Sequence, residues 1–572
     1  MNQRVSYNEL IEKLNIKRHV FFECDKNKLN VFSGNVVVNN KDITLIIEFP
    51  ENFPLHFPDI YTKEHGYIHP HINYKTGKIC LFDDTSLLID TKDKFSVLLD
   101  GFDRALEILS IVNDREAFKN EIVREYYSYW QSRAKDFVYT NLTVSGNLTY
   151  YNCKMVLCNN ISLVSNSVNE TKDILKKIDG CDTSKCLYRD CTVIKLREFV
   201  LPALNDNFEY NWKWLRGFIR NHITSSQKKK FDTFLSLKQK NIGRYILLVI
   251  PSDENDIILG FYISGVNNSL RSIRNLNDCN IRCVYTQRLD YEYLLKRSGN
   301  LVGLRNKRIL LLGCGSIGGY VASNLCQIGV CEIDIVDQDV FSFDNIHRHI
   351  LGFNDASKSK QKSDLLKVYL ENNYPNVKIR STESVGKYAE RLLLDTSRLR
   401  SYDLIISALG EPTINLELDS VLMRNRINVP FIVCFNEPYG IGGHVICSNV
   451  KNDSCLRCLY TDIVSNDLAP FVLSFVDVGQ DFKKTLSGCS GNFVAYSGLD
   501  SQQTALITAK TAMEILSNEI SENLVVSWIG SSKKLEDNGF RTSEYYEQKA
   551  KEGIDRVLRC RIEKNKWCTV CN

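Results

Sequence analysis

The chain has 572 residues, of which 44% are hydrophobic and 24% are charged, and its formal net charge is +4. This length predicts about three domains of ordinary globular composition, and the small net charge excludes a dominant nucleic-acid-binding surface. No signal pattern opens the chain, and apolar runs such as Ile309–Leu312 are far too short to span a bilayer. We therefore expect a soluble, cytoplasmic protein with no membrane and no nucleic-acid partner.

Residues 1–145 form the first predicted domain. Strand-like alternation covers Asn30–Val38 and Asp42–Phe49, and helices are predicted over Leu98–Ile111 and Arg115–Tyr139. A loop region with prolines and histidines lies between them. The mixture of strands and helices is typical of an α+β domain.

Residues 146–295 form the second predicted domain, a linker domain of the α+β class. Short strands such as Tyr245–Ile250 and Ile257–Ser264 are mixed with polar connections. Five cysteines lie between Cys153 and Cys191 without a chemical motif. A large chain with 20 cysteines and no signal pattern is expected to keep its thiols reduced and to use a few as metal ligands or nucleophiles.

Residues 296–572 form the third predicted domain, a Rossmann-like α/β sheet in which a strand, a glycine turn, a helix and a second strand follow one another. The strand Arg308–Leu312 leads into a GxGxxG motif, and the strand Glu332–Val336 ends at Asp337. The glycines of the motif are Gly313, Gly315 and Gly318. They let backbone N–H groups approach a phosphate, and Asp337 is placed to accept hydrogen bonds from a ribose.

The residues after this motif favour ATP over NAD. Asn345, Arg348 and lysines at positions 358, 360 and 362 follow the strand that ends at Asp337. Hydride transfer has no need of so many cations, whereas Arg and Lys neutralise the charge that develops as pyrophosphate leaves a triphosphate. ATP is therefore the predicted nucleotide, and a triphosphate recruits Mg²⁺.

Four cysteines in this domain are predicted to bind Zn²⁺. Cys455 and Cys458 form one CxxC pair, and Cys568 and Cys571 form a second. Two such pairs supply the four thiolates of a closed tetrahedral site, which leaves no position for a substrate. We expect a structural zinc ion that ties the last residues onto the domain.

Two other cysteines are candidate nucleophiles. Cys489 lies in the glycine-rich segment Gly488–Gly491 ahead of a helix predicted over about Ser501–Leu516. A thiol in such a segment is accessible, and the helix start and nearby lysines favour its thiolate. Cys80 follows a proline-rich stretch and a His-Pro-His tripeptide that ends at His71.

The segments ILLLGCGSIGG, VDQDVFSFDNIHRH and SKQK resemble the adenylation core of the ubiquitin-activating family, including its bacterial sulfur-carrier relatives. The resemblance implies contacts to ribose from Asp337, to phosphates from Asn345 and Arg348, and to the triphosphate from Lys362. The family's usual magnesium aspartate is missing after the strand Leu404–Ile406, which leaves Asp339 and Glu411 as candidates. A split zinc site is also a feature of this family.

The segment around Cys489 resembles the GC-x-x-x-F-x-x-YS-x-x-D pattern of bacterial activating domains, which implies that Cys489 forms a thioester. Residues 1–140 resemble the ubiquitin-conjugating fold, which implies that Cys80 is an acceptor thiol. His71 stands where that family has the asparagine that polarises the thioester carbonyl. It either donates a hydrogen bond to the oxyanion or only braces the loop.

An activating domain and a conjugating domain on one chain resemble the bacterial fusions of CBASS antiphage islands. The resemblance implies ATP-dependent adenylation of a partner's C-terminus, a thioester on Cys489, transfer to Cys80 and conjugation to a target amine. The partner is then a ubiquitin-like protein or a cyclic-oligonucleotide synthase, and the chain is a homodimer in which Arg288 or Arg297 reaches the other subunit's ATP. Two alternatives stay open: a sulfur-carrier-protein adenylyltransferase for cofactor biosynthesis, and an activating enzyme whose N-terminal domain only recruits a partner.

Overall fold

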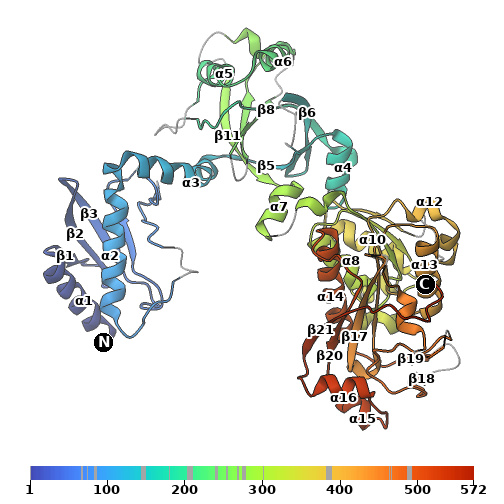
Figure 1. Cartoon of the computed structure of the whole chain (residues 1–572). Coiled ribbons are helices and arrows are strands. Elements are labelled where there is room, and N and C mark those ends of the chain that lie inside the picture. Colours follow the sequence, from blue (N-terminus) through green and yellow to red (C-terminus); the bar gives the residue numbers. More distant parts are fainter. Residues whose placement is uncertain are drawn as a thin grey trace. The chain divides into compact units, whose positions relative to one another are not determined.

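The structure of the chain, a computed structural model, describes residues 2–65, 69–73, 75–82, 87–143, 150–178, 181–202, 210–238, 243–252, 256–266, 269–273, 279–299, 302–381, 389–451, 453–462, 464–465, 467–485 and 492–571. The chain divides into two compact units, one of residues 1–172 and 181–288 and one of residues 173–180 and 289–572 (Figure 1). Within the described residues, no helix is both long and apolar enough to cross a bilayer.

The first unit opens with a four-stranded antiparallel sheet and two helices that pack on it (Figure 1). In chain order these are α1 (Asn2–Arg18), β1 (Phe21–Cys24), β2 (Val31–Val38), β3 (Lys41–Glu48), β4 (Asp59–Thr62) and α2 (Lys94–Ser110). A tight turn at Asn39 and Asn40, both with positive φ, joins β2 to β3 and suits a two-residue hairpin. Leu45 of β3 and Leu98 of α2 are completely buried in the core between the sheet and the helices.

The third helix of this unit, α3 (Arg115–Arg133), ends earlier than the predicted helix Arg115–Tyr139, so that prediction was wrong at its C-terminal end. The remaining residues form β5 (Asp136–Asn141), which pairs in parallel with one strand on each side. Two hydrogen-bonded ladders and the complete burial of Val138 stabilise the strand. These tertiary interactions outweigh the local helical pattern.

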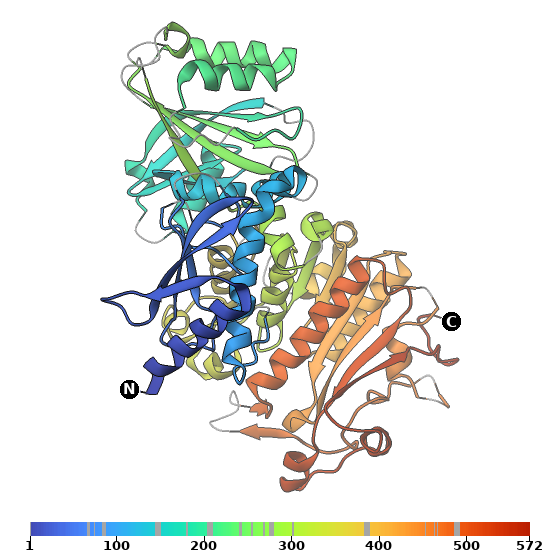
Figure 2. The ribbon, with the colours of Figure 1, turned by 90° about the vertical axis from the view of Figure 1, so that its left-hand side faces the viewer.

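The rest of the first unit is a closed barrel with the strand order β10-β11-β5-β7-β6-β8-β9, in which β9 also pairs with β10. Its other strands are β6 (Tyr150–Cys158), β7 (Ile161–Ser165), β8 (Leu187–Lys195), β9 (Arg244–Ile250), β10 (Ile257–Ser264) and β11 (Asn280–Arg288). Two helices accompany it, α5 (Trp212–Asn221) and α6 (Ser225–Ser236), drawn in green in Figure 2. The barrel strands run from Asp136 to Arg288, whereas the predicted linker domain covers residues 146–295.

Two cysteines of the barrel unit, Cys158 and Cys181, form a disulfide, although reduced thiols were predicted for this chain. They are separated by 23 positions in the sequence. Only the fold brings the end of β6 beside the segment that precedes β8.

The second unit contains an eight-stranded sheet with the order β14-β13-β12-β15-β16-β17-β20-β21. These strands are β12 (Arg308–Leu312), β13 (Glu332–Val336), β14 (Lys378–Arg380), β15 (Leu404–Ser407), β16 (Phe431–Asn436), β17 (Gly442–Ser448), β20 (Leu524–Ile529) and β21 (Arg556–Arg561). The first five strands in the order are parallel, and β17, β20 and β21 continue the sheet in antiparallel fashion. This parallel half is the predicted Rossmann-like part.

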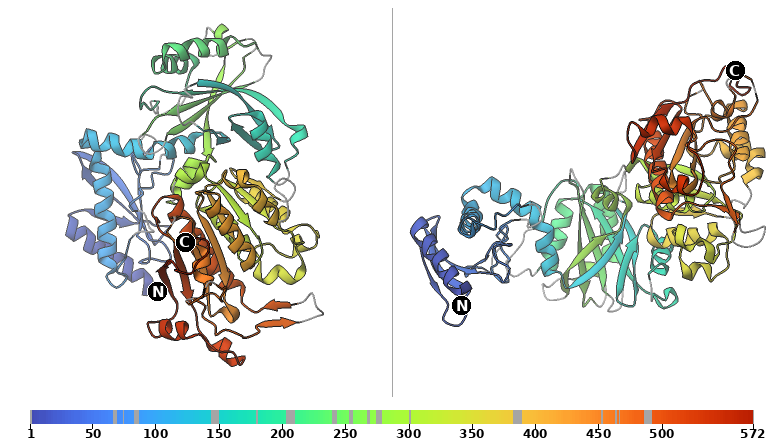
Figure 3. Two further views of the ribbon diagram at one scale, coloured as in Figure 1. Left: turned by 45° about the vertical axis from the view of Figure 1, so that its right-hand side comes forward. Right: turned by 90° about the horizontal axis from the view of Figure 1, so that it is seen from below.

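Alternate residues of each central strand enter two different cores, one on each face of the sheet. Helices cover both faces of this sheet (Figure 3). Ile309 and Leu311 face α8 (Gly318–Gln327), α10 (Lys362–Asn373) and α14 (Gly498–Leu516), whereas Leu310 and Leu312 face α13 (Pro412–Arg424). Burial on both faces explains why these strands are continuous apolar runs. The shorter elements named in the text are α4 (Val168–Lys176), α7 (Tyr291–Arg297), β18 (Lys483–Thr485) and β19 (Asn492–Val494).

Candidate functional site

The glycine motif lies at the carboxyl ends of β12, β13 and β15, where an open cleft holds about 580 Å³ of empty space. Gly313 follows β12 with φ +80°, and a Cβ atom there would stand 2.9 Å from the carbonyl oxygen of Ala408. A Cβ atom on Gly318, the first residue of α8, would stand 2.1 Å from the carbonyl oxygen of Gly313. Both positions require glycine, and the result is a tight backbone turn at the start of a helix beside the cleft, which suits an anion.

Asp337 organises the floor of this cleft. Its side chain is 8% exposed. One carboxylate oxygen accepts a hydrogen bond from the backbone N–H of Cys314 at 2.7 Å, and the other accepts from the backbone N–H of Asp339 at 2.8 Å. The carboxylate therefore joins the ends of β12 and β13, the position from which a Rossmann-like fold contacts a ribose.

Lys362 brings a cation into the same cleft. It is the first residue of α10 and is 9% exposed, and its Nζ lies 2.8 Å from Oδ2 of Asp339. The cleft also contains Glu411, the residue before α13. Both candidate magnesium ligands, Asp339 and Glu411, thus line the cleft together with Gly313. A lysine and carboxylates that line one cleft are suited to a triphosphate with a divalent ion.

Asn345 and Arg348 lie in the short helix Phe343–Arg348 and are not among the residues that line the cleft. The Asn345 side-chain oxygen accepts hydrogen bonds from the N–H and the hydroxyl of Ser342, each at 3.3 Å. Asn345 thus caps this helix in the structure, and any role for it and Arg348 at phosphates stays a prediction.

The sequence analysis did not single out His349, which braces the glycine turn. Its Nδ1 accepts from the backbone N–H of Leu351, which leaves Nε2–H to donate to the carbonyl oxygen of Cys314 at 2.7 Å. Burial lowers the pKa of His349, which favours this neutral tautomer. The sequence signal was weak, because a lone histidine beside apolar residues is ordinarily a satisfied core residue.

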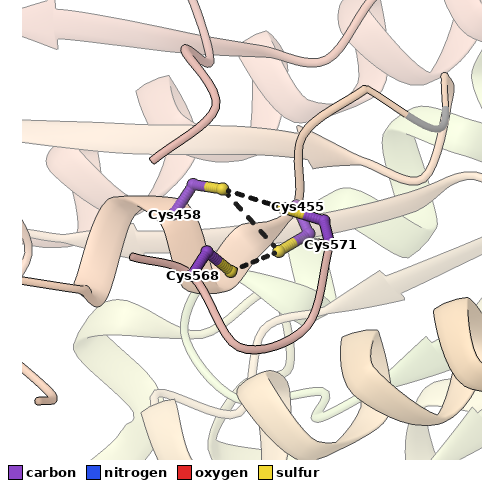
Figure 4. Close-up of side chains that lie close together, drawn as sticks. All are labelled: Cys455, Cys458, Cys568 and Cys571. Carbon is purple, nitrogen blue, oxygen red and sulfur yellow. Dashed lines mark hydrogen bonds between the residues drawn. The ribbon is translucent and has the colours of Figure 1, made fainter. Parts of the chain in front are cut away.

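The four predicted zinc ligands meet in space although more than 100 residues separate the two pairs (Figure 4). Cys455 Sγ lies 3.8 Å from Cys458 Sγ and 3.5 Å from Cys568 Sγ, and Cys458 Sγ lies 3.4 Å from Cys571 Sγ. A tetrahedral ion with Zn–S bonds of about 2.3 Å requires sulfur–sulfur distances of about 3.8 Å, so the cluster fits such an ion. The buried carboxylate of Asp419 accepts from the N–H of Leu456 at 2.9 Å and steadies the first CxxC turn.

Cys489, the predicted thioester-forming residue, lies outside the described residues. The strands β18 and β19 on either side of it form a two-stranded antiparallel sheet. Shortly after β19, the hydroxyl of Tyr496 lies 3.1 Å from the hydroxyl of Ser316 in the glycine turn. α14 then begins with a capping box between Ser497 and Asp500, three residues earlier than predicted. Tyr496 therefore hydrogen-bonds to the glycine turn.

Cys80 is exposed, and its backbone N–H donates to the carbonyl oxygen of His71 at 2.7 Å. The bridge between Ile72 and Ile79 holds the two sides of this loop together. His71 itself has φ +62°, a left-handed conformation that is uncommon outside glycine. The tripeptide and Cys80 thus lie side by side where the two sides of this loop meet, a place called the Cys80 turn below.

Two glutamates of α3 hold the His71 ring. Nδ1 lies 2.5 Å from Oε1 of Glu125, and Nε2 lies 3.2 Å from Oε2 of Glu121. The backbone N–H of His71 also donates to Glu125, at 2.8 Å, and so does the hydroxyl of Tyr129, at 2.9 Å. The hydrogen bond with Glu125 raises the pKa of His71 despite burial, and the bonds from His71 and Tyr129 lower the pKa of Glu125 although burial opposes this. Sequence reasoning missed both glutamates, because their spacing is also that of an ordinary solvated helix face.

Other residues of α3 pack against the barrel. Trp130 is completely buried, and its Nε1–H donates to the carbonyl oxygen of Val284 in β11 at 2.9 Å. The hydroxyl of Tyr126 donates to the carbonyl oxygen of Pro202 at 2.8 Å. The helix α3 therefore holds the Cys80 turn with some residues and is anchored to the barrel unit by others.

The two arginines considered for a contact across a dimer belong to different units. Arg288 ends β11, and its guanidinium donates to the carbonyl oxygen of Asp256 at 2.6 Å. Arg297 ends α7, in the second unit. A role for either at a second subunit's nucleotide stays a prediction.

Two family models match the chain in separate places. The ThiF family matches residues 293–528, which contain the nucleotide cleft. The prokaryotic E2 family B matches residues 13–139, which contain Cys80 and α3.

Two curated relatives are also similar to this chain. It is 23% identical over 542 residues to the ATP-dependent ubiquitin transferase-like protein Cap2 of Escherichia coli strain TW11681, over 87% of each chain. A second protein of that name, from Pseudomonas aeruginosa strain BWHPSA011 / Pa011, is 22% identical over 68% of this chain and 70% of its own length. A crystal structure of E. coli MccB with ATP is similar over 49% of this chain and 69% of that chain, with 15% identity and a TM-score of 0.33. The chain is an E1-like adenylating enzyme fused to an E2-like domain, and these two parts match the ThiF family and the prokaryotic E2 family B respectively.

Proposed function

We propose that this chain activates the C-terminal carboxylate of a partner protein with ATP and passes the acyl group through two cysteines to an amine. The carboxylate oxygen attacks the α-phosphorus, pyrophosphate leaves, and an acyl-adenylate forms. The Cys489 thiolate attacks the acyl carbon and AMP leaves. The Cys80 thiolate then displaces Cys489, and an amine finally displaces Cys80 and loses a proton as the amide forms. No step needs an oxidant or a further co-reactant.

The observation that carries this proposal is the exposed thiol of Cys80 in an E2-like fold on the same chain as an adenylation cleft. A tethered acceptor meets its donor at an effective concentration of about millimolar if the linker permits it. A sulfur-carrier adenylyltransferase needs no such second domain. The resemblance to CBASS fusions makes antiphage defence the proposed setting, with a ubiquitin-like protein or a cyclic-oligonucleotide synthase as the partner.

The positions of several residues in the cleft support proposed contacts to ATP. Asp337 would accept hydrogen bonds from the ribose, and Lys362 would contact the triphosphate, since both line the cleft beside the glycine turn. Mg²⁺ would neutralise the phosphates with Asp339 or Glu411 as its protein ligand. Asn345 and Arg348 would reach the phosphates only if their helix approaches a bound nucleotide, and an arginine of a second subunit would complete the site in a homodimer.

The four-cysteine cluster supports a structural zinc ion held by Cys455, Cys458, Cys568 and Cys571. It ties the last residues of the chain to the segment after β17, and none of the four cysteines lines the cleft. All four donors are thiols, so the ion has no open position for chemistry.

His71 is proposed as a positioning residue. Both of its ring nitrogens already contact glutamates of α3, so donation to an oxyanion would require the loss of one of these contacts. Its carbonyl oxygen instead fixes the backbone N–H of Cys80. This favours the bracing role of the two that the sequence left open.

One gel tests the relay. Wild type, Cys80→Ala, Cys489→Ala and the control Cys24→Ala, a half-buried free cysteine, are incubated with ATP and the partner protein encoded beside this chain's gene. We expect thiol-reducible adducts in wild type and control, an adduct without amide conjugates in Cys80→Ala, and neither in Cys489→Ala. Undiminished conjugates in Cys80→Ala would show that the E2-like domain only recruits a partner. Adenylate formation without any thioester would favour the sulfur-carrier alternative.

A further inference from the structure

Three cysteines of the barrel meet at the ends of two neighbouring strands. β6 ends at Cys158, β8 begins at Leu187, and the antiparallel register pairs Leu157 with Leu187. One step beyond this pair, Cys158 stands opposite Cys186. Cys181 lies earlier in the segment before β8, and its sulfur atom reaches the same place. Three sulfur atoms therefore gather there.

The geometry sets a thiol beside a disulfide. Cys158 and Cys181 are bonded to each other, with Cα atoms 5.9 Å apart, a usual separation for a disulfide. Cys186 is a free cysteine, and its Sγ lies within 4.8 Å of both bonded sulfurs. Cys158 is 2% exposed, whereas Cys181 and Cys186 are half-buried. Solvent therefore reaches the thiol and the outer half of the disulfide more readily than the inner half.

We propose that Cys158, Cys181 and Cys186 form a thiol–disulfide exchange site whose external substrates are small thiols and dithiols. The Cys186 thiolate attacks Sγ of Cys181. A Cys181–Cys186 bond forms, the Cys158–Cys181 bond breaks, and Cys158 takes up the proton that Cys186 lost. This internal step needs no other reactant. Complete reduction to three thiols consumes an external dithiol, which becomes a disulfide.

The exchange changes which part of the chain is tied down. The Cys158–Cys181 bond joins the end of β6 to a segment 23 positions later. A Cys181–Cys186 bond closes only the short turn around Thr183–Lys185 and releases Cys181 from β6. The site therefore decides whether the segment before β8 is covalently tied to the end of β6.

The test uses the full chain purified without reductant. It is treated briefly with substoichiometric dithiothreitol, quenched with acid, alkylated, and mapped by peptide mass spectrometry. We expect wild type to contain both the Cys158–Cys181 and the Cys181–Cys186 pairs, Cys186→Ser to lose the second, and Cys158→Ser to contain only the second. Cys24→Ser, which removes a half-buried cysteine elsewhere, should match wild type.

Three results would overturn this assignment. One is the absence of a Cys181–Cys186 bond in wild type after the treatment. Another is full alkylation of all three cysteines before any reductant is added. The third is a second zinc ion per chain that is lost in Cys186→Ser, which would make the trio a thiolate metal site. Cys158 is buried, so the Cys158→Ser variant could fail to fold. In that case the comparison of wild type with Cys186→Ser still decides each of the three results.

Discussion

Glu125→Gln tests whether α3 holds the Cys80 turn in place. The change keeps the size of the side chain but removes the charge that faces His71 Nδ1 at 2.5 Å. Both side chains are 25% exposed, so the contact is partly shielded from water. A hydrogen bond to a charged group contributes about 2 kcal/mol, and its loss should raise the population of the open turn about 30-fold.

Hydrogen exchange at the Cys80 backbone N–H measures this opening, because that group donates to the carbonyl oxygen of His71. We expect the protection of this amide in the full chain to fall about 30-fold in Glu125→Gln. Thioester formation on Cys80 should slow, while adenylation, which does not involve this turn, should be unchanged. Glu116→Gln, at an exposed position in the first turn of α3, is the matched control.

The effect should depend on pH with a defined sign. The pKa of His71 is raised in the folded chain, so the pair contributes its full stability below the ordinary histidine pKa of about 6.5. That contribution is lost as the pH rises through the raised pKa of His71. The pKa of Glu125 is lowered, so on the acid side the contribution is lost as the pH falls through that lowered value. If Cys80 protection in Glu125→Gln equals that of wild type at pH 6, the bracing role of His71 is refuted.

Three further predictions concern the adenylation unit. Cys568→Ser should lower bound zinc from one ion per chain to less than half and reduce the Tm of this unit by roughly 10 °C. The control Cys560→Ser should change neither. Metal analysis and calorimetry measure both variants. Gly313→Ala should weaken ATP binding at least about tenfold in titration calorimetry, because an alanine at φ +80° costs about 1–2 kcal/mol and its Cβ meets a carbonyl. Lys362→Ala should slow partner-dependent pyrophosphate exchange about 100-fold, and a rate equal to that of the exposed control Lys378→Ala would exclude a role for Lys362 at the triphosphate.

Local sequence patterns were enough to predict the glycine turn of the cleft and the four cysteines that gather in one cluster. The strand Arg308–Leu312, the glycine turn and Asp337 are defined by neighbouring residues, because the turn admits only glycine and both faces of the strand are buried. The CxxC pairs carry their own ligand spacing, and the cluster forms as that spacing suggests. Where chemistry depends on residues close in sequence, the sequence contains the information.

The features that the sequence did not reveal all depend on contacts between distant segments. β5 is a strand because β11 and β7 pair with it on both sides, and no property of residues 136–141 alone outweighs the helical pattern before them. The contacts between Glu125 and His71 join residues 54 positions apart. A glutamate on a helix gives no sequence signal of which distant residue it contacts. The Cys158–Cys181 disulfide likewise depends on the barrel register. Residue types and spacing thus determined the glycine turn and the cysteine pairs, whereas tertiary structure decided which distant side chains contact His71 and Cys80, because long-range packing energies exceed local preferences.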